Sequence, residues 1–251
     1  MRRLPFFSVV ELIPESYIAP LDLPKIFGRV APLHVDLGCG NGSFLCALAE
    51  RMPEKNFLGI ERLLGRVRSA CRKAARIDNI RVIRVETAYA VRYLLPERSV
   101  QVFHLLFPDP WPKRRHQRRR VMTPEFLRSV HCALTPQGLL RIATDQLDYF
   151  DQMQRLARAD PQFAIVDPLL AMPVGVDDVA GPGEAGQLLY TNDAIGRRVQ
   201  IEGAGQPSPI DSIGCLRAKR VDLPLTKFER KFQQQGVPIH RLALRKVSPV
   251  M

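Results

Sequence analysis

The amino-acid sequence predicts an α/β protein with a doubly wound, mostly parallel sheet and one late antiparallel strand. Short apolar runs of strand length alternate with longer segments of helical period over residues 33–145. A glycine-rich turn at residues 38–42 joins the first run to a helix, which is the cofactor-binding unit of doubly wound sheets. Acidic residues terminate four of the runs, at the strand ends where such sheets bind ligands.

The length, composition and charge of the chain limit its domain organisation and its class of partner. With 251 residues and 46% hydrophobic content, we expect one domain over residues 1–251, entered by an arm of residues 1–30. The formal net charge of +12 and the isoelectric point near 10 favour a polyanionic partner, nucleic acid before a membrane surface. We expect no membrane anchor and no export, because the sequence has no basic amphipathic anchor, no long apolar run and no apolar signal core.

The five cysteines indicate a reduced protein without a structural metal. They are widely spaced, odd in number and form no Cys-x-x-Cys pair, which argues against a zinc site and against a disulfide framework. We therefore expect packing residues of a cytoplasmic protein at Cys39, Cys46, Cys71, Cys132 and Cys215. The sequence leaves a monomer and a homodimer open.

The first predicted strand, residues 33–37, leads through the glycine turn into a helix over residues 43–51. Ser43 stands where the dinucleotide-binding pattern has its third glycine, which disfavours a nicotinamide cofactor. Asp36, just before the turn, would repel a pyrophosphate but suits the cationic amino acid end of S-adenosylmethionine. Its alternative role is a carboxylate that caps nearby backbone amides.

The next two predicted strands also end in polar side chains. The strand over residues 56–61 ends at Glu61, 19 residues after Gly42, the spacing of an acid that accepts both ribose hydroxyls of an adenosine cofactor. Alone, Glu61 would be read as an exposed strand-end glutamate. A helix over residues 62–77 follows, with a basic face that we expect to be solvated. After a strand over residues 80–85, Glu86 and Thr87 stand where an adenine edge can be read, before a short helix over residues 88–95.

The stretch over residues 107–116 follows a predicted buried strand, residues 99–106. We expect its prolines at positions 108, 110 and 112 to hold the chain extended, so that Asp109 is presented at the carboxyl end of the strand by a stiff backbone. Trp111 either stacks on a base or packs within the protein. A run of cationic side chains follows, which is suited to binding phosphates. The alternative interpretation of the whole stretch is a rigid turn followed by a solvated basic loop without a binding role. The run consists of Lys113, Arg114, Arg115, Arg118, Arg119 and Arg120.

The remaining predicted elements complete the sheet. A helix begins at Thr123, and a turn at residues 136–138 precedes a strand over residues 139–145. Residues 167–222 are expected to form a loop-rich insertion, before a helix that ends near residue 234 and an alternating strand over residues 239–244. Four strand ends of a parallel sheet lie along one edge, so we expect their acids to converge. These acids are Asp36, Glu61, Asp109 and Asp145.

Together, these motifs resemble, in their order, those of the bacterial tRNA (guanine-N7)-methyltransferases. The resemblance covers residues 33–165 and 223–246. The proline–aspartate–proline–tryptophan block is highly specific, whereas the glycine turn is shared by many methyltransferases. The motifs are Asp36-x-Gly-x-Gly-x-Gly, Gly59-Ile60-Glu61, Phe107-Pro108-Asp109-Pro110-Trp111-Pro112-Lys113 with its arginines, Ala143-Thr144-Asp145 and Thr226-Lys227-Phe228-Glu229.

The resemblance implies the seven-stranded, Rossmann-like fold of class I methyltransferases, with S-adenosylmethionine as the methyl donor. It implies tRNA (guanine(46)-N7)-methyltransferase activity on a guanosine of the tRNA variable loop, with Asp109 as the catalytic residue. Cofactor contacts are implied for Asp36, Gly38, Gly40, Glu61, Thr87 and Asp109. Substrate contacts are implied for Lys113, Asp145, Thr226, Lys227, Phe228 and Glu229.

Two departures from the family pattern leave alternatives open. The family usually has an aspartate where this chain has Thr87, although a hydroxyl still accepts a hydrogen bond and Glu86 can compensate. The insertion of residues 167–222 is longer than the usual connection. A tRNA-binding protein of this fold that has lost catalysis is the main alternative function. A nicotinamide-dependent oxidoreductase is the second, disfavoured by Ser43 and by the charge.

Overall fold

The computed structural model describes residues 10–168 and 223–247, and residues 1–9, 169–222 and 248–251 lie outside this description. The described strands are β1 Glu11–Leu12, β2 Leu33–Leu37, β3 Asn56–Glu61, β4 Ile80–Arg84, β5 Val100–Leu106, β6 Leu134–Thr144, β7 Phe163–Val166 and β8 His240–Lys246. The described helices are α1 Leu23–Phe27, α2 Ser43–Arg51, α3 Leu64–Ala74, α4 Thr87–Tyr89, the π-helix η1 Ala90–Leu94, the 3-10 helix η2 Arg114–Arg119, α5 Pro124–Ala133, α6 Leu147–Ala159 and α7 Lys227–Gln234.

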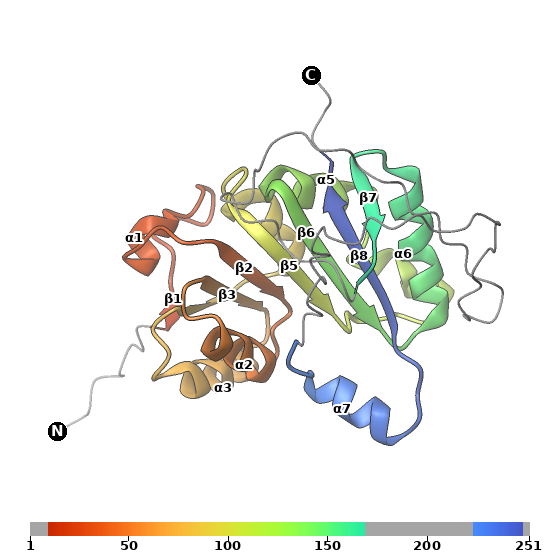
Figure 1. Cartoon of the computed structure of the whole chain (residues 1–251), viewed down its shortest axis with the longest axis horizontal. Helices are drawn as coiled ribbons and strands as arrows, with labels where there is room; N and C mark the ends of the chain where they lie inside the picture. Colours follow the sequence, from red (N-terminus) through yellow and green to blue (C-terminus); the bar gives the residue numbers. More distant parts are fainter. Residues whose placement is uncertain (1–9, 169–222, 248–251) are drawn as a thin grey trace, which may run out of the picture. The chain divides into compact units, whose positions relative to one another are not determined.

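The strands form one sheet in the order β1-β4-β3-β2-β5-β6-β8-β7 (Figure 1). All neighbours from β1 to β6 are parallel, and β8 runs antiparallel to both β6 and β7. Without the two-residue β1, seven strands remain, so the predicted doubly wound, mostly parallel sheet with a late antiparallel strand is confirmed. Strand order reverses beside β2, because β3 and β4 lie on one side of it and β5 and β6 on the other.

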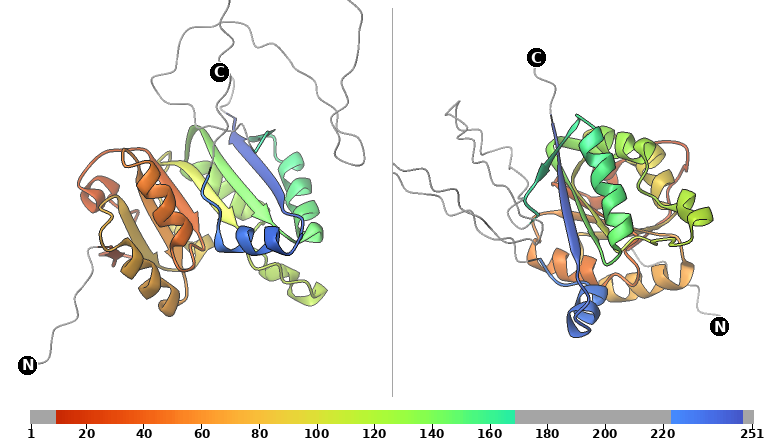
Figure 2. Two further views of the ribbon diagram at one scale, coloured as in Figure 1. Left: turned by 60° about the horizontal axis from the view of Figure 1, so that its bottom comes forward. Right: turned by 90° about the vertical axis from the view of Figure 1, so that its right-hand side faces the viewer.

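Helices cover both faces of the sheet and bury an apolar core on each. One core holds side chains of α2 and α3 against β3 and β4, including Phe44, Leu48 and Val67. The other holds side chains of η1, α5 and α6, including Phe126 and Tyr149. In Figure 2, α6 lies beside β7 and β8. Burial from both faces explains why the central strands read as continuous apolar runs rather than as alternating ones.

Local signals in the sequence set several helix starts. The Thr123 hydroxyl accepts from the Phe126 amide at 3.1 Å and Pro124 opens α5, as predicted. At α7 the Thr226 hydroxyl accepts from the Glu229 amide at 3.0 Å, and the Glu229 carboxylate accepts from the Thr226 amide at 2.8 Å. This reciprocal capping box makes α7 begin at residue 227.

Several boundaries differ from the sequence-based expectation. The predicted turn at residues 136–138 lies inside β6, which begins at Leu134. Its register against β5 shifts between the pairs Val100–Leu134 and Val102–Leu139, and Gln137 there has φ of +60°. The turn residues therefore form a bulge in the strand. Helix α6 and strand β7 were not anticipated, and the expected arm contains β1 and α1.

The cysteines divide by burial. Cys39, Cys46 and Cys71 are buried free thiols, which confirms their predicted packing role. Cys132 is also a free thiol but is exposed, so the packing prediction is wrong there. Cys215 and nearly all of the predicted insertion lie outside the described residues. Every described residue belongs to the same compact unit, and no helix among them is long and apolar enough to span a bilayer.

Candidate functional site

A cleft of about 500 Å³ opens at the carboxyl ends of the central strands. Its walls come from the ends of β2 and β3, the start of α4 and the loop after β5. Four predicted site residues line it, namely Gly38, Glu61, Thr87 and Asp109. The strand order reverses beside β2, and open α/β sheets bind their ligands at such a reversal, so this cleft is the candidate site.

The glycine turn is fastened to the neighbouring strand and to the helix behind it. The amides of Gly38 and Cys39 both donate to the Ile60 carbonyl oxygen, at 2.8 and 2.9 Å. Gly42 has φ of +74°, a left-handed backbone that favours glycine. A Cβ on Gly42 would also lie only 2.8 Å from the Cβ of Ala70, so the start of α2 approaches α3 more closely than a side chain would allow.

Glu61 is buried at the end of β3, with 5% of its surface exposed. Its carboxylate accepts hydrogen bonds from the Gly40 amide at 3.1 Å and the Leu63 amide at 2.8 Å, and the Arg66 guanidinium lies 3.8 Å away. The alternative of an exposed strand-end glutamate is therefore wrong. A carboxylate offers about four acceptor positions, so two remain to accept from ligand hydroxyls.

Asp36 is buried below the turn, with 4% of its surface exposed, and accepts no hydrogen bond from the described part of the chain. The described structure therefore offers no amide for the capping role considered as its alternative. Burial, with a smaller contribution from the negative charge of Glu61, raises the pKa of the Asp36 carboxyl to about 7. A cationic group bound beside it would stabilise the carboxylate and lower this pKa again.

We expect the affinity of this site for a cationic ligand to depend on pH through Asp36. In the free protein the carboxyl, with its pKa of about 7, is protonated at lower pH, and binding must then expel the proton. S-adenosylmethionine affinity, measured by calorimetry from pH 5.5 to 8.5, should fall by up to about tenfold per pH unit below 7. The control is Asp36→Asn, which should bind weakly with a flat profile. A wild-type profile as flat as that of the variant would contradict the proposed contact.

The same buried carboxyl should make the free protein less stable at alkaline pH. Its pKa is about 7 in the fold and 3.8 as the ordinary value, so the folded chain binds the proton more tightly than the unfolded chain. The contribution of Asp36 to stability is therefore fully present below pH 3.8 and is lost as the pH rises through about 7. The upper limit of the loss is about 4 kcal/mol.

Thr87 and Glu86 lie side by side at the wall of the cleft. Glu86 is the N-cap of α4 and accepts from the amides of Ala88 at 3.0 Å and Tyr89 at 2.8 Å. Its carboxylate is thus partly committed to the helix. Thr87 is the first residue of α4. Its hydroxyl can accept a hydrogen bond in place of the carboxylate that the family usually has at this position.

The loop after β5 is bent rather than extended. Phe107 has φ of +53° and Trp111 φ of +42°, so bulky residues adopt a left-handed backbone on both sides of the Pro108–Pro110 segment. The prediction that the prolines hold the whole stretch extended is therefore wrong. Such conformations cost of order 1–3 kcal/mol each and persist where the surroundings over-determine them. The bend turns the exposed Asp109 into the cleft.

Arg120 holds this loop from behind. Its guanidinium is buried, donates to the Pro110 carbonyl oxygen at 2.8 Å and to Gln152 at 2.6 Å, and pairs with Asp148. It also lies 4.5 Å from the centre of the Tyr149 ring. The prediction that Arg120 belongs to a phosphate-binding run is therefore wrong. Sequence alone gives no signal for this difference, because Arg120 follows two exposed arginines in an unbroken basic run.

Trp111 makes two contacts within the protein while it lines the cleft. The Arg119 guanidinium lies 4.9 Å from its ring centre, and the His116 ring meets it edge-on at 5.9 Å. The cationic run is helical rather than a loop, because residues 114–119 form η2. Packing therefore accounts for part of the Trp111 surface, and stacking on a base stays a prediction.

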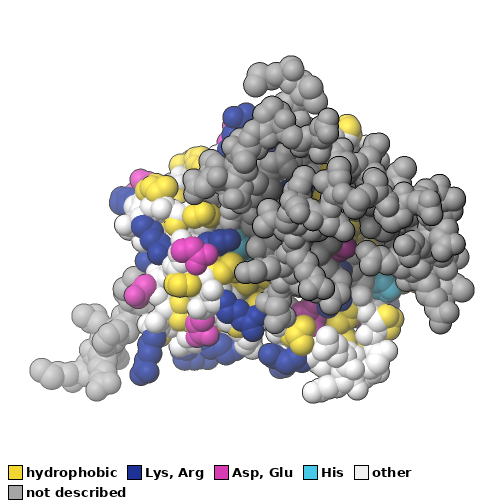
Figure 3. Space-filling view, in the orientation of Figure 1, with side chains coloured by type: hydrophobic (Ala, Val, Ile, Leu, Met, Phe, Trp, Pro, Cys, Tyr) yellow, Lys and Arg dark blue, Asp and Glu magenta, His cyan; other side chains and the backbone are white. Residues whose placement is uncertain are grey.

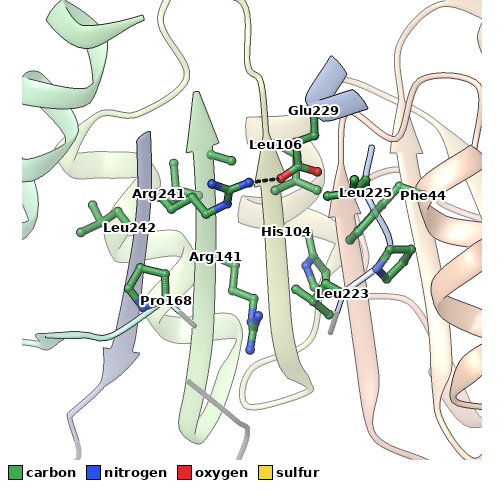
Figure 4. A pocket seen from close by; sticks show the side chains of 13 residues that line it. Phe44, His104, Leu106, Arg141, Pro168, Leu223, Leu225, Glu229, Arg241 and Leu242 are labelled. Carbon is green, nitrogen blue, oxygen red and sulfur yellow. Dashed lines mark hydrogen bonds and ion pairs between the residues drawn. The ribbon is translucent and has the colours of Figure 1, made fainter. Parts of the chain in front are cut away.

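Helix α7 lies against the start of the same loop. The rings of Phe228 and Phe232 lie 5.7 and 5.5 Å from that of Phe107. The Glu229 carboxylate takes part in the capping box and in an ion pair with Arg241 at 2.9 Å. Figure 4 shows this ion pair at the wall of a second cavity, which has a volume of about 300 Å³. Of the four motif residues in 226–229, positions 227 and 228 are exposed, and 226 and 229 are buried.

The second cavity has apolar walls and two buried basic side chains, His104 and Arg141, which point into it in Figure 4. Burial keeps the pKa of His104 well below its ordinary value, and its Nε2 lies 3.3 Å from Nδ1 of His34, within hydrogen-bond distance. None of the predicted cofactor residues lines this cavity.

The other predicted site residues do not line the cleft. The Gly40 amide donates to the Glu61 carboxylate, and the buried Asp36 carboxyl lies close enough to Glu61 for the negative charge of Glu61 to raise its pKa. Lys113 and Asp145 follow the two central strands at the same edge but do not line the cleft; Asp145 accepts from the Gln146 side chain at 2.6 Å. Several residues of the cleft wall received no site role from the sequence, among them Arg62, Leu63 and Arg66. Among the described residues, no three histidine, cysteine or acidic side chains are grouped as a metal site would require.

Comparison with known proteins places these features in a family. A family model described as "Putative methyltransferase" matches residues 30–176. Proteins named tRNA (guanine-N(7)-)-methyltransferase are similar to this chain in Leifsonia xyli subsp. xyli (43% identity over 65% of this chain), Halorhodospira halophila (39% over 60%) and Aromatoleum aromaticum (38% over 57%). The matched part amounts to 67%, 65% and 56% of the lengths of these relatives. The chain therefore matches about two thirds or less of each.

Proposed function

Because the chain belongs to the family of tRNA (guanine-N7)-methyltransferases, we propose that it transfers the methyl group of S-adenosylmethionine to N7 of a guanosine in the variable loop of tRNA. One structural observation supports this proposal most directly. Glu61, Thr87 and Asp109 come from three separate segments and line one cleft at the reversal of strand order. The net charge of +12 suits a polyanionic substrate.

The residues of the cleft fit the methyl donor by their chemistry. Asp36 is a buried carboxyl with a raised pKa and no hydrogen bond from the described residues, which suits a cationic amino acid end. Glu61 has acceptor positions free for ribose hydroxyls, and Thr87 or Glu86 can accept from an adenine amino group. When bound, the donor supplies an electrophilic methyl group on a sulfonium centre.

The proposed reaction needs positioning more than acid–base chemistry. Guanine N7 carries a free lone pair, so no proton has to be removed before it attacks the methyl carbon. The site must hold the nucleophile and the methyl carbon in line, which by itself lowers a barrier substantially. We assign Asp109 to the orientation of guanine, by accepting from its N–H edge. Lys113, the exposed arginines of η2 and Lys227 would neutralise phosphates.

A direct test is incubation of unmodified tRNA with labelled S-adenosylmethionine, followed by mapping of the labelled base. We expect label at N7 of one variable-loop guanosine. Label on another atom or another loop would refute the assignment, as would the absence of transfer by well-folded protein that binds the donor.

A second candidate function is a tRNA-binding protein that has lost catalysis, and the observation that favours it is Thr87 at the cleft wall. In that case calorimetry would detect no binding of S-adenosylmethionine, although tRNA would still bind. A nicotinamide-dependent oxidoreductase would instead bind NAD in the same experiment.

Thr87→Asp distinguishes an active site from a relic. A carboxylate is a stronger acceptor than a hydroxyl, so the variant should bind S-adenosylmethionine more tightly by up to about 1–2 kcal/mol without changing the methylated base. Thr87→Val is the matched control, which keeps the shape of the side chain and removes the acceptor. Equal donor affinity in wild type and both variants would show that residue 87 does not contact the adenine.

A further inference from the structure

Helix α3 and its flanks carry an unusual concentration of positive charge. Residues 62–77 contain six basic side chains and no acidic one, which is half of the net charge of +12 of the whole chain. All six are exposed. We name them the α3 basic face: Arg62, Arg66, Arg68, Arg72, Lys73 and Arg76.

The described neighbours leave most of this charge uncompensated. Arg66 lies 3.8 Å from Glu61, and its side chain is 57% exposed, so this pair is weak. Lys73 donates to the Ser43 hydroxyl at 2.6 Å, which is not a charge partner. Among the described residues, none of the other four forms an ion pair.

The arrangement within the helix is unfavourable for a face that is only solvated. Solvated helix faces usually alternate charges, because opposite charges one turn apart stabilise the helix. Here Arg68 and Arg72 stand four residues apart and repel each other. Arg66 lies in the first turn, at the positive end of the helix dipole, where α3 itself has no acidic residue and the Glu61 carboxylate offsets the charge only from 3.8 Å. A bound anion would relieve both effects.

The face is continuous with the candidate site. Arg62 and Arg66 line the cleft, at the amino-terminal end of α3. Arg72, Lys73 and Arg76 line a groove of about 860 Å³ at the other end, together with Arg29 and the acids Glu50 and Asp78. The eleven residues of α3 span about 16 Å. In Figure 3, Lys and Arg side chains gather over the region where Figure 1 draws α2 and α3.

The length and charge of the α3 basic face indicate which kind of ligand it can bind. A single small anion would occupy one end only, whereas a basic face of this length suits a chain of phosphates. A membrane surface is disfavoured, because the apolar side chains of α3, such as Val67 and Ala70, are buried in the core and cannot enter a bilayer.

We propose that the α3 basic face binds the sugar–phosphate backbone of tRNA outside the nucleotide that enters the cleft. This rests on the proposed function, which places the target guanosine in the cleft. The face would guide the RNA past the mouth of the cleft without reading its sequence, because phosphate contacts position a nucleic acid but do not specify bases.

The test uses the full chain with Arg68, Arg72 and Arg76 all replaced by alanine. The dissociation constant for tRNA should rise at least tenfold at low salt. The slope of log affinity against log salt should flatten by about 0.7 to 0.9 for each lost phosphate contact. The matched control removes three positive charges from exposed helix positions elsewhere, with Arg92→Ala, Arg155→Ala and Arg158→Ala, and should keep the wild-type slope.

Two further measurements separate this inference from the proposed function. Turnover on a short variable-loop oligonucleotide at saturating concentration should be unchanged in the α3 variant, because none of its three residues lines the cleft. If wild type methylates tRNA and the variant binds tRNA with the wild-type affinity and slope, this inference is overturned and the proposed function stands. Loss of binding to anionic phosphatidylserine vesicles with tRNA binding unchanged would overturn it in favour of a membrane surface. If wild type neither binds nor methylates tRNA, the proposed function fails first.

Discussion

Replacing Asp109 with alanine is expected to lower methyl transfer to tRNA by about 100-fold or more while the protein stays folded. The carboxylate is exposed, lines the cleft, and forms neither a hydrogen bond nor an ion pair with any other described residue. A side chain that forms no hydrogen bond or ion pair with the described residues contributes little to stability, so the free energy of unfolding should change by less than about 0.5 kcal/mol. Single-turnover transfer of label to tRNA, together with thermal unfolding of the same samples, measures both quantities.

Asp109→Asn is the informative companion to the alanine variant. Its amide oxygen still accepts a hydrogen bond but carries no charge. If Asp109 orients the guanine, the asparagine variant should retain more activity than the alanine variant, and both should bind S-adenosylmethionine like wild type. Near wild-type turnover in Asp109→Ala would remove this residue from the mechanism.

Replacing Arg120 with alanine should cost both stability and turnover. The guanidinium is 3% exposed and holds the Pro110 carbonyl, Gln152 and Asp148, so its loss leaves polar groups unpaired around a cavity beside Tyr149. Because the Asp148 side chain is 54% exposed and can be solvated, we expect a loss of about 2–4 kcal/mol, below the full effect of an isolated buried charge. Urea unfolding measures this loss.

The functional part of the Arg120 prediction follows from its bond to Pro110. That proline follows Asp109, so a loosened loop should lower kcat and leave the affinity for S-adenosylmethionine unchanged. Arg120→Lys keeps the charge but lacks the planar fork that reaches several acceptors, so it should restore stability only in part. The control is Arg118→Ala, an exposed neighbour whose loss should reduce the salt dependence of tRNA binding without lowering stability. If Arg120→Ala changed that salt dependence and not kcat, Arg120 would be a phosphate ligand after all.

The prediction from sequence was most accurate where the signal is local. The limits of β2, α2 and β3 match the expected residues, because glycine, apolar period and strand length are all read within a few neighbours along the chain. The start of α5 at Thr123 and Pro124 follows from a hydrogen bond that spans three residues. The sequence-based expectation omitted α6 and β7, although α6 has a clear amphipathic period.

The sequence by itself determined which strands end in an acidic residue, where the glycine turn lies and which family pattern the chain follows, since each of these depends on residue types at fixed spacing. Only the tertiary structure decided what the environment of each side chain is. It separated the buried Arg120 from the exposed Arg118, raised the pKa of Asp36 by burial, and bent the backbone at Phe107 and Trp111. It also brought Arg62 and Arg66, at the amino-terminal end of α3, to the wall of the cleft. These properties arise from contacts between residues far apart in the chain, and burial, unlike local hydrogen bonding, is a property of the packed whole.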